Sequence, residues 1–533
     1  MMLGLAVPGA PAAQVREDFS DFAALEAAGA VIREVRIVPQ DIFDTSDPRE
    51  DHALFRLANR LHIRTRPEVI RRALLFQPGE AVSVRRIQET ERRLRANRYL
   101  YDVQFRALAV NEREVDVEVV TRDTWSLDFG LSASRSGGAS SGGFGLREYN
   151  LFGTGSTLAI GRQRDVDRTT NLFAFANDRV LGSRIGVAYS HATNSDGQRD
   201  EAVVGQPFRA LDDRRAFGAR ALRDDRLDSV YRGGLLQSQY RHVERSGDVY
   251  AGWSQGLVDG WVQRTSVVLQ LQEDRYGLEP GVVAPAALPP DQKLAAPFVR
   301  VEWLEDRFER DFNRNLIGRP EFFALGLVAS AQLGWSTPVL GASRRAALYE
   351  FALSRGFEPG EDDRLILVAK VAGQFEDDRI RRGSVGVLGQ YYRPQSPRRL
   401  FYASAALDTL QRPDPGTELL LGGDNGLRGY PLRYQSGQHR ALFTVEQRFY
   451  TDVFVWQLFR LGGAGFLDAG RAWGGPAGAE TTSGWLANAG AGLRIVSARS
   501  AFANVLHIDL AFPLNAAGDI RTVQLNVRTK TSF

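Results

Sequence analysis

The sequence predicts a mostly β chain in which a transmembrane antiparallel β-barrel follows a small α+β domain. No stretch of the 533 residues approaches the run of about 20 apolar residues that a membrane-spanning helix needs. The mean hydropathy of −0.26 is compatible with a barrel, because only every second residue of a barrel strand faces lipid. Glycine is abundant, 10% of the residues are aromatic and cysteine is absent, a composition typical of turn-rich barrels from an oxidising compartment.

The residue patterns divide the chain into three parts, with the main boundary near Thr124. Residues 1–30 open with an apolar stretch and then small residues, and we interpret them as a signal-peptide remnant or flexible leader. Residues 31–122 are expected to form a small α+β domain. Its predicted order is β-α-α-β-β, with elements at 31–38, 67–76, 84–97, 101–109 and 114–121.

Residues 123–533 are predicted to form the barrel. Phe323 to Trp335 alternate in a run long enough to cross a bilayer as a tilted strand of about 9 to 11 residues. A soluble β-sandwich is the alternative, but soluble strands average about 5 to 6 residues, and several runs here are longer. Polar loops such as Asn194 to Glu201 separate the runs. Allowing about 25 residues for each strand with its loop predicts about 16 strands.

The last strand alternates up to an aromatic C-terminal residue. Leu525, Val527 and Phe533 occupy apolar positions of this run. The ending resembles that of bacterial outer-membrane barrels, so these three residues are predicted to form a C-terminal assembly signal.

Three ordered segments carry the candidate functional residues. These are Leu427, Arg428, Gly429 and Tyr430 in a glycine-rich loop, followed by Glu446, Phe466, Asp468 and Gly470 on strands. The arginine offers a fork of donors that matches a carboxylate, and the glycines let the loop fold tightly. Val445 and Leu467 are the apolar members of their local alternation, so the adjacent carboxylates are expected to face the lumen. The loop arginine can meet them there, and the phenylalanine can add a cation–π contact.

These segments resemble the motifs of the outer-membrane assembly and translocation superfamily, which is the BamA/TamA-like or bacterial surface antigen family. The loop resembles the family's Val/Leu-Arg-Gly-Tyr/Phe signature, Gly465 to Trp473 its aromatic-Asp-Gly strand, and Thr444 to Phe449 its acidic strand. The β-α-α-β-β order is similar to a POTRA domain, the family's periplasmic module. The resemblance implies that the loop enters the barrel and that Arg428 contacts the acidic strands. The alternative is that these charges only line a polar lumen.

The resemblance implies a bacterial outer-membrane protein that inserts or translocates other proteins, with its N-terminal domain in the periplasm. The expected partners are the outer-membrane lipid bilayer, unfolded or exported protein clients, and a periplasmic partner at the POTRA-like domain. An open sheet edge in that domain can bind a client by strand addition, whereas a plain spacer is the alternative. A two-partner-type secretion transporter for a dedicated exoprotein and a passive pore or structural barrel also stay open.

Other functional classes find little support in the residues. The six histidines lack metal-site spacing and cysteine is absent, so no metal and no cofactor are expected. His507 and Asp509 share a strand face without a placed serine nucleophile, and no enzymatic activity is predicted. No basic run is interleaved with aromatic residues, so no nucleic-acid partner is expected.

Overall fold

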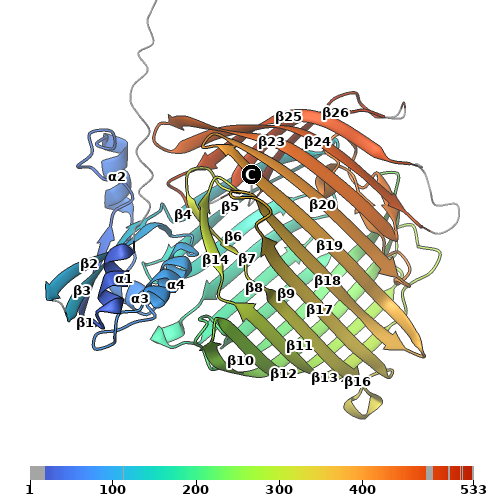
Figure 1. Ribbon diagram of the computed structural model, residues 1–533. Coiled ribbons are helices and arrows are strands. Elements are labelled where there is room, and N and C mark those ends of the chain that lie inside the picture. The colour runs from blue at the N-terminus through green and yellow to red at the C-terminus, as the bar shows by residue number, and fades with distance from the viewer. Residues whose placement is uncertain are drawn as a thin grey trace, which may run out of the picture.

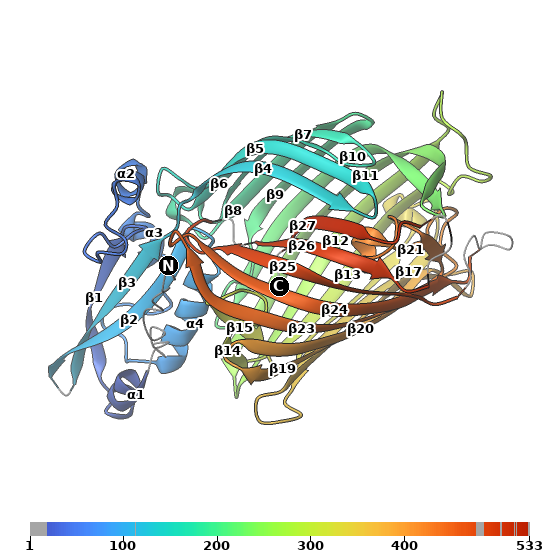
Figure 2. The ribbon, with the colours of Figure 1, turned by 90° about the horizontal axis from the view of Figure 1, so that it is seen from above.

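A computed structural model describes residues 19–111, 113–475, 484–501, 504–515, 518 and 520–530. A small N-terminal domain lies at one end of a closed β-barrel in both views of the ribbon (Figure 1, Figure 2). Within these residues, no helix combines the length and apolar character that crossing a membrane requires. Most of the predicted leader lies outside the described residues, and helix α1 (Ser20–Ala27) occupies part of the remainder.

The N-terminal domain packs helices against a three-stranded mixed sheet. After α1 its elements are β1 (Val31–Gln40), α2 (Ala53–Leu61), α3 (Pro67–Arg71), α4 (Val84–Arg95), β2 (Leu100–Asn111) and β3 (Glu114–Asp123). The central strand β3 is parallel to β1 and antiparallel to β2. Ile70 of α3 and Ile87 of α4 are buried in one core with Val117 of β3. Helices α1 and α2 add to the predicted order, and the assignment as a POTRA domain stays a prediction.

The barrel contains twenty antiparallel strands within the described residues. In chain order they are β4 (Leu127–Ser136), β5 (Ala139–Leu151), β6 (Ser156–Arg164), β7 (Thr169–Asn177), β8 (Gly186–Asn194), β9 (Gly197–Gln206), β10 (Arg215–Arg232), β11 (Leu235–Val258), β12 (Trp261–Gly277), β13 (Gln292–Glu305), β16 (Val328–Ser336), β17 (Ala346–Phe357), β18 (Arg364–Glu376), β19 (Arg379–Ser396), β20 (Arg399–Gln411), β23 (His439–Val455), β24 (Phe459–Trp473), β25 (Leu486–Ser497), β26 (Val505–Pro513) and β27 (Gln524–Lys530). The last strand, β27, closes the barrel against β4.

Shorter elements lie between some of the barrel strands. They are η1 (Val180–Gly182), β14 (Phe308–Phe312), β15 (Pro320–Ala324), η2 (Pro338–Leu340), β21 (Leu419–Leu421), η3 (Gly423–Asn425) and β22 (Gln435–Gly437). Among these elements, β14 pairs with β15 and β21 pairs with β22, and each pair forms a small two-stranded sheet of its own. Both pairs belong to segments that bear on the candidate site.

The prediction of about 16 strands was wrong because several connections are tight turns instead of loops. Gly137 and Gly138, both at positive φ, join β4 to β5, and Asp259 and Gly260 join β11 to β12. The expected polar loop Asn194–Glu201 is itself the tip of the β8–β9 hairpin. Two-residue turns of this kind suit residues that tolerate positive φ, so each strand uses fewer residues than we assumed.

The run from Phe323 to Trp335 is not the single strand that alternation predicts. It divides into β15 and β16, and only β16 joins the barrel, whereas β15 pairs with β14. Between the two, the amides of Leu325 and Gly326 both donate to the carbonyl of Arg307. These hydrogen bonds turn the chain at a point where the alternation of residue types continues unbroken.

The outer surface of the barrel changes from apolar to charged along neighbouring strands. One row of cross-strand partners on β9 to β13 is apolar and consists of Val204, Ala219, Val249, Leu269 and Pro297. Four residues further along each strand, the corresponding row is charged and consists of Asp200, Arg223, Arg245, Glu273 and Lys293. An apolar band with charged residues at its border is what a lipid-facing barrel surface requires.

Replacing Val249 by Arg is therefore expected to destabilise the barrel in a bilayer by about 2–4 kcal/mol, because the charge would face lipid. Val243 lies on the same strand beyond the charged row, and Val243→Arg is expected to cost about 0–1 kcal/mol. Denaturant titration of both variants in lipid vesicles measures the difference. Equal effects would contradict the assignment of the apolar row to lipid.

Candidate functional site

The loop between β20 and β23 folds back against the inner face of the barrel wall. Its residues Leu427 and Tyr430 are fully buried in a cluster with Leu421 of β21 and Leu486 of β25. Gly470 on β24 leaves room for this cluster, because a Cβ there would lie 3.2 Å from the Leu421 side chain. Apolar packing thus holds the loop inside the barrel.

Arg428 lies on this loop with only 3% of its surface exposed. Its guanidinium donates two hydrogen bonds of 2.8 Å to the two oxygens of Asp468, and a third of 2.9 Å to Glu446. The guanidinium carbon lies 3.4 Å from the centroid of the Phe466 ring, and a carboxylate oxygen of Asp509 is 3.7 Å from the nearest guanidinium nitrogen. A bidentate arginine–carboxylate pair fixes orientation as well as charge, so the loop has a defined docked position.

Two more buried arginines balance the acidic side chains around this site. Arg448 donates to Glu446 at 2.9 Å, and Arg494 donates to Asp509 at 2.5 Å. Together with Arg428 and Asp468, they give three guanidinium groups facing three carboxylates. Burial of charge is tolerated only where the charges are paired and hydrogen-bonded, and this cluster meets that condition.

The backbone beside Arg428 is fitted closely to the wall. The amide of Gly429 donates to the side-chain oxygen of Asn488 at 3.1 Å, and Asn488 also donates to Asp468 at 2.9 Å. A Cβ on Gly429 would lie 2.6 Å from the Cβ of Asn488, so only glycine permits this approach. The Tyr430 hydroxyl donates to the carbonyl of Ala487 at 3.0 Å.

The predicted C-terminal signal falls at the seam between the last and first strands. Val527 of β27 pairs with Arg135 of β4, and this is the one register pair that joins the two strands in the described part of the chain. By contrast, seven register pairs join β27 to β26. Leu525 is exposed on the outer surface, and Phe533 lies outside the described residues.

The Arg428 loop contacts both sides of this seam. The carbonyl of Arg428 accepts a hydrogen bond of 2.8 Å from the side-chain amide of Asn526 on β27. The amide of Leu432 donates to the carbonyl of Gly137, in the β4–β5 turn, at 3.3 Å. The amide of Gly137 donates in turn to Asn526 at 3.4 Å. The loop therefore bridges the strands where their backbone pairing is sparse.

A second arginine of the loop ties it to the turns at the far end of the barrel. Arg433 donates to both oxygens of Asp167 in the β6–β7 turn, at 2.8 and 2.5 Å, and lies 4.1 Å from the centroid of the Tyr231 ring. The next residue, Arg168, contacts Asp196 of the β8–β9 turn at 3.4 Å. The loop thus has a second polar anchor five residues after Arg428, and sequence reasoning missed it.

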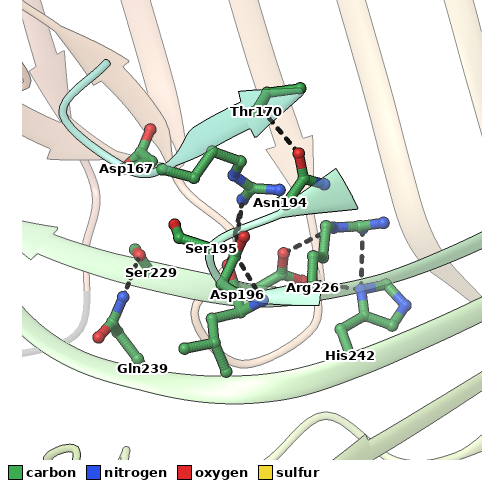
Figure 3. Close-up of polar contacts among 12 residues, drawn as sticks. Asp167, Thr170, Asn194, Ser195, Asp196, Arg226, Ser229, Gln239 and His242 are labelled. Carbon is green, nitrogen blue, oxygen red and sulfur yellow. Dashed lines mark hydrogen bonds and ion pairs between the residues drawn. The ribbon is translucent and has the colours of Figure 1, made fainter. Parts of the chain in front are cut away.

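An acidic and histidine cluster lies near these turns. Within the described residues, His242, Glu244 and Asp274 offer potential metal ligand atoms within 4.8 Å of one another. Arg226 on the adjacent strand points at His242 (Figure 3), with its guanidinium 2.9 Å from Nδ1. It also donates to Asp224 at 2.9 Å. This guanidinium already supplies the positive charge that a metal would bring, so the geometry favours an ionic network.

The β14–β15 hairpin reaches the buried cluster from the end of the barrel that bears the N-terminal domain. Arg448, which binds Glu446, also donates to the carbonyl of Arg314 beyond β14 at 2.7 Å. At the other side of the hairpin, the guanidinium carbon of Arg92 on α4 lies 4.0 Å from the centroid of the Phe308 ring. A continuous set of contacts thus leads from the N-terminal domain to the docked loop.

Sequence reasoning brought together Arg428, Glu446 and Asp468 but missed several of their partners. Arg448 lies two residues after Glu446 on the same inward face of β23, so the alternation alone could have predicted that the two side chains are neighbours. No sequence pattern distinguishes Asn488 and Asn526 as partners of the loop, because uncharged polar residues line the interior of many barrels.

Comparison with known proteins gives fold-level likenesses. No family model matches the sequence, and no curated protein matches it. Similar solved structures include BamA from Haemophilus ducreyi lacking POTRA domains 1–3, which is 12% identical over 94% of this chain and 84% of that chain, with a TM-score of 0.41. CdiB from Escherichia coli is 13% identical over 95% of this chain and 77% of that chain, with a TM-score of 0.49. CdiB from Acinetobacter baumannii is 13% identical over 94% and 74%, with a TM-score of 0.39. Each TM-score is below 0.5, and each likeness concerns the fold alone.

Replacing Arg428 by Ala is expected to lower the free energy of unfolding by about 3–5 kcal/mol, because the buried Asp468 would lose its bidentate ion pair and Glu446 would lose one of its two arginine partners. The control is Arg220→Ala, which breaks a more exposed pair with Glu201 and should cost about 0–1 kcal/mol. Urea titration of both variants in lipid vesicles measures the two effects. A similarly small loss for both would mean that the buried pair does not hold the loop.

Proposed function

We propose that this chain is a bacterial outer-membrane barrel that inserts or translocates other proteins, without enzymatic chemistry or a cofactor. The observation that carries the proposal is the buried Arg428 loop, which contacts β27 on one side of a sparsely paired seam and the β4–β5 turn on the other. The apolar outer row of the barrel supports a place in the lipid bilayer. The N-terminal domain, which lies at one end of the barrel, would then project into the periplasm.

The sparse seam gives the proposed mechanism its physical basis. Backbone groups without partners are costly in a hydrocarbon environment, so a strand edge at the seam would favour pairing with an incoming strand. A client strand could therefore be added there, by the same hydrogen bonding that holds the rest of the sheet. The most sparsely paired junction of the barrel, between β27 and β4, would then be the place where client strands are added.

The docked loop would keep this edge closed at rest. Asn526 and Gly137 lie on opposite sides of the seam, and both bond to the loop backbone. Withdrawal of Arg428 from its carboxylates would release both contacts together. The loop would thus act as a clamp whose strength is set by the buried ion pairs.

Secretion of a dedicated exoprotein through the lumen is the main alternative, and it would need the loop to leave the lumen without the seam parting. A passive pore is opposed by the position of the loop, which occupies space inside the barrel in the resting state. The two translocating mechanisms differ in their clients. Insertion serves many barrels, whereas dedicated secretion serves one exported protein.

Client binding at the N-terminal domain remains a separate prediction. Strand β2 lies at an edge of the sheet, as strand addition requires. Two of its carbonyls are already occupied, because Leu100 accepts from Arg319 at 3.3 Å and Val103 accepts from Arg95 at 2.6 Å. A client would therefore have to pair further along β2, on the side of Arg106.

Depletion of the protein from its host is expected to lower the abundance of many outer-membrane barrels together. Quantitative profiling of outer-membrane and secreted proteins measures this effect, and restoring the intact gene should reverse it. Loss of a single exported protein would support dedicated secretion instead. No change in either set would contradict both translocating functions and favour a passive or structural barrel.

A further inference from the structure

Helix α2 of the N-terminal domain presents a row of leucines to its surroundings. Leu54, Leu57 and Leu61 are 65%, 47% and 64% exposed. Their spacing of three and four residues places them on one face of the helix. Ile63, just beyond the helix, is also exposed. Such a row on a short helix is an apolar surface that water does not favour.

The opposite side of α2 is fixed in the protein, so the leucine row is not a misplaced core face. Phe55 is buried and stacks on Phe43, with ring centroids 4.0 Å apart. Asn59 accepts from the amide of Phe43 at 3.1 Å and donates to its carbonyl at 2.8 Å. With this side anchored, the leucines must point outward.

The leucine row lies at the rim of the barrel. Leu54 and Phe55 line one groove with Phe454, near the end of β23, and with Trp456 and Leu458 of the β23–β24 turn. Trp456 is 77% exposed, as an aromatic residue at a membrane interface can be. The apolar surface of α2 therefore continues onto the rim of the barrel's outer surface.

Three further contacts hold this region at the rim. Glu50, just before α2, forms an ion pair with Arg499 in the β25–β26 turn. The amide of Trp125 donates to the carbonyl of Arg499 at 2.8 Å, and the amide of Ala501 donates to the carbonyl of Trp125 at 2.9 Å. Helix α2 is thus positioned against the barrel end instead of extending freely into solvent.

We propose that α2 is an interfacial helix whose leucine row lies in the periplasmic leaflet of the membrane, with phospholipid as its partner. The inference rests on the proposed outer-membrane location. Lipid is favoured as the occupant because the row is continuous with the lipid-facing rim and carries a tryptophan beside it. Arg60 lies on the adjacent face of the helix, where it can meet lipid phosphates, whereas Arg56 is paired with Asp51.

The natural sequence has no cysteine, so single cysteines can report on each surface of the full-length protein. A fluorophore at Leu57→Cys is expected to be quenched in vesicles of brominated phospholipid. The same label at Val249→Cys, on the apolar outer row, should also be quenched. A label at Glu26→Cys should not be, because α1 lies at the end of the domain opposite α2 (Figure 2).

The pattern of quenching separates the two proposals. Quenching at 249 without quenching at 57 would overturn the lipid contact of α2 and leave the membrane location intact. Absence of quenching at 249 would overturn the membrane location itself. A label at 57 that is shielded from aqueous iodide but not quenched by lipid would mean that a second copy of the chain covers the helix.

A second variant guards against an accidental effect of the label. Leu57 and Leu61 are exposed, so replacing both by Glu should leave the fold intact. With a fluorophore at Leu54→Cys, the double replacement is expected to reduce quenching by brominated lipid severalfold. Unchanged quenching would contradict the proposal, because the helix would then lie near lipid even though its leucine row no longer contacts the membrane.

Discussion

The docked state of the structure depends on one buried guanidinium. Arg428 is removed from water, which is tolerable only because Asp468 binds it at two points and Glu446 at a third. This geometry leaves the loop little freedom of position. Once the loop is placed, its backbone lies within hydrogen-bond reach of both Asn526 and Gly137, on the two sides of the seam. A local charge pairing thus determines how the barrel is closed.

The same cluster connects the two ends of the molecule. On one side, Arg433 and Asp167 join the loop to the turns beyond the charged outer row. On the other side, Arg448 links the cluster to the β14–β15 hairpin, against which the N-terminal domain packs. A displacement of that domain would therefore shift the hairpin, and the hairpin would in turn shift Arg448 and the buried charges that it contacts. Under the proposed function, a client bound at the domain would act on the seam through these contacts.

The sequence predicted what depends on local periodicity and on charge within short segments. Alternation indicated the barrel, and an arginine among glycines followed by strand carboxylates indicated the docked loop. The number of strands could not be obtained, because the tight turns at Gly137 and Asp259 leave no stretch of polar loop to count. Contacts such as Arg433 with Asp167 join residues far apart in the sequence, and no periodicity relates them. Helix α2 escaped prediction because its leucines face outward, where a core was not expected.

The most direct test of this account measures whether the Arg428 pairing keeps the seam closed. Cysteines replacing Val527 and Arg135, the register partners of β27 and β4, can form a disulfide across the seam in a chain that has no other cysteine. The account predicts a high yield of this disulfide under mild oxidation when Arg428 is present. It predicts a clearly lower yield when Arg428→Ala is added. The same yield with and without the arginine would contradict the central claim, because the seam would then be closed independently of the docked loop.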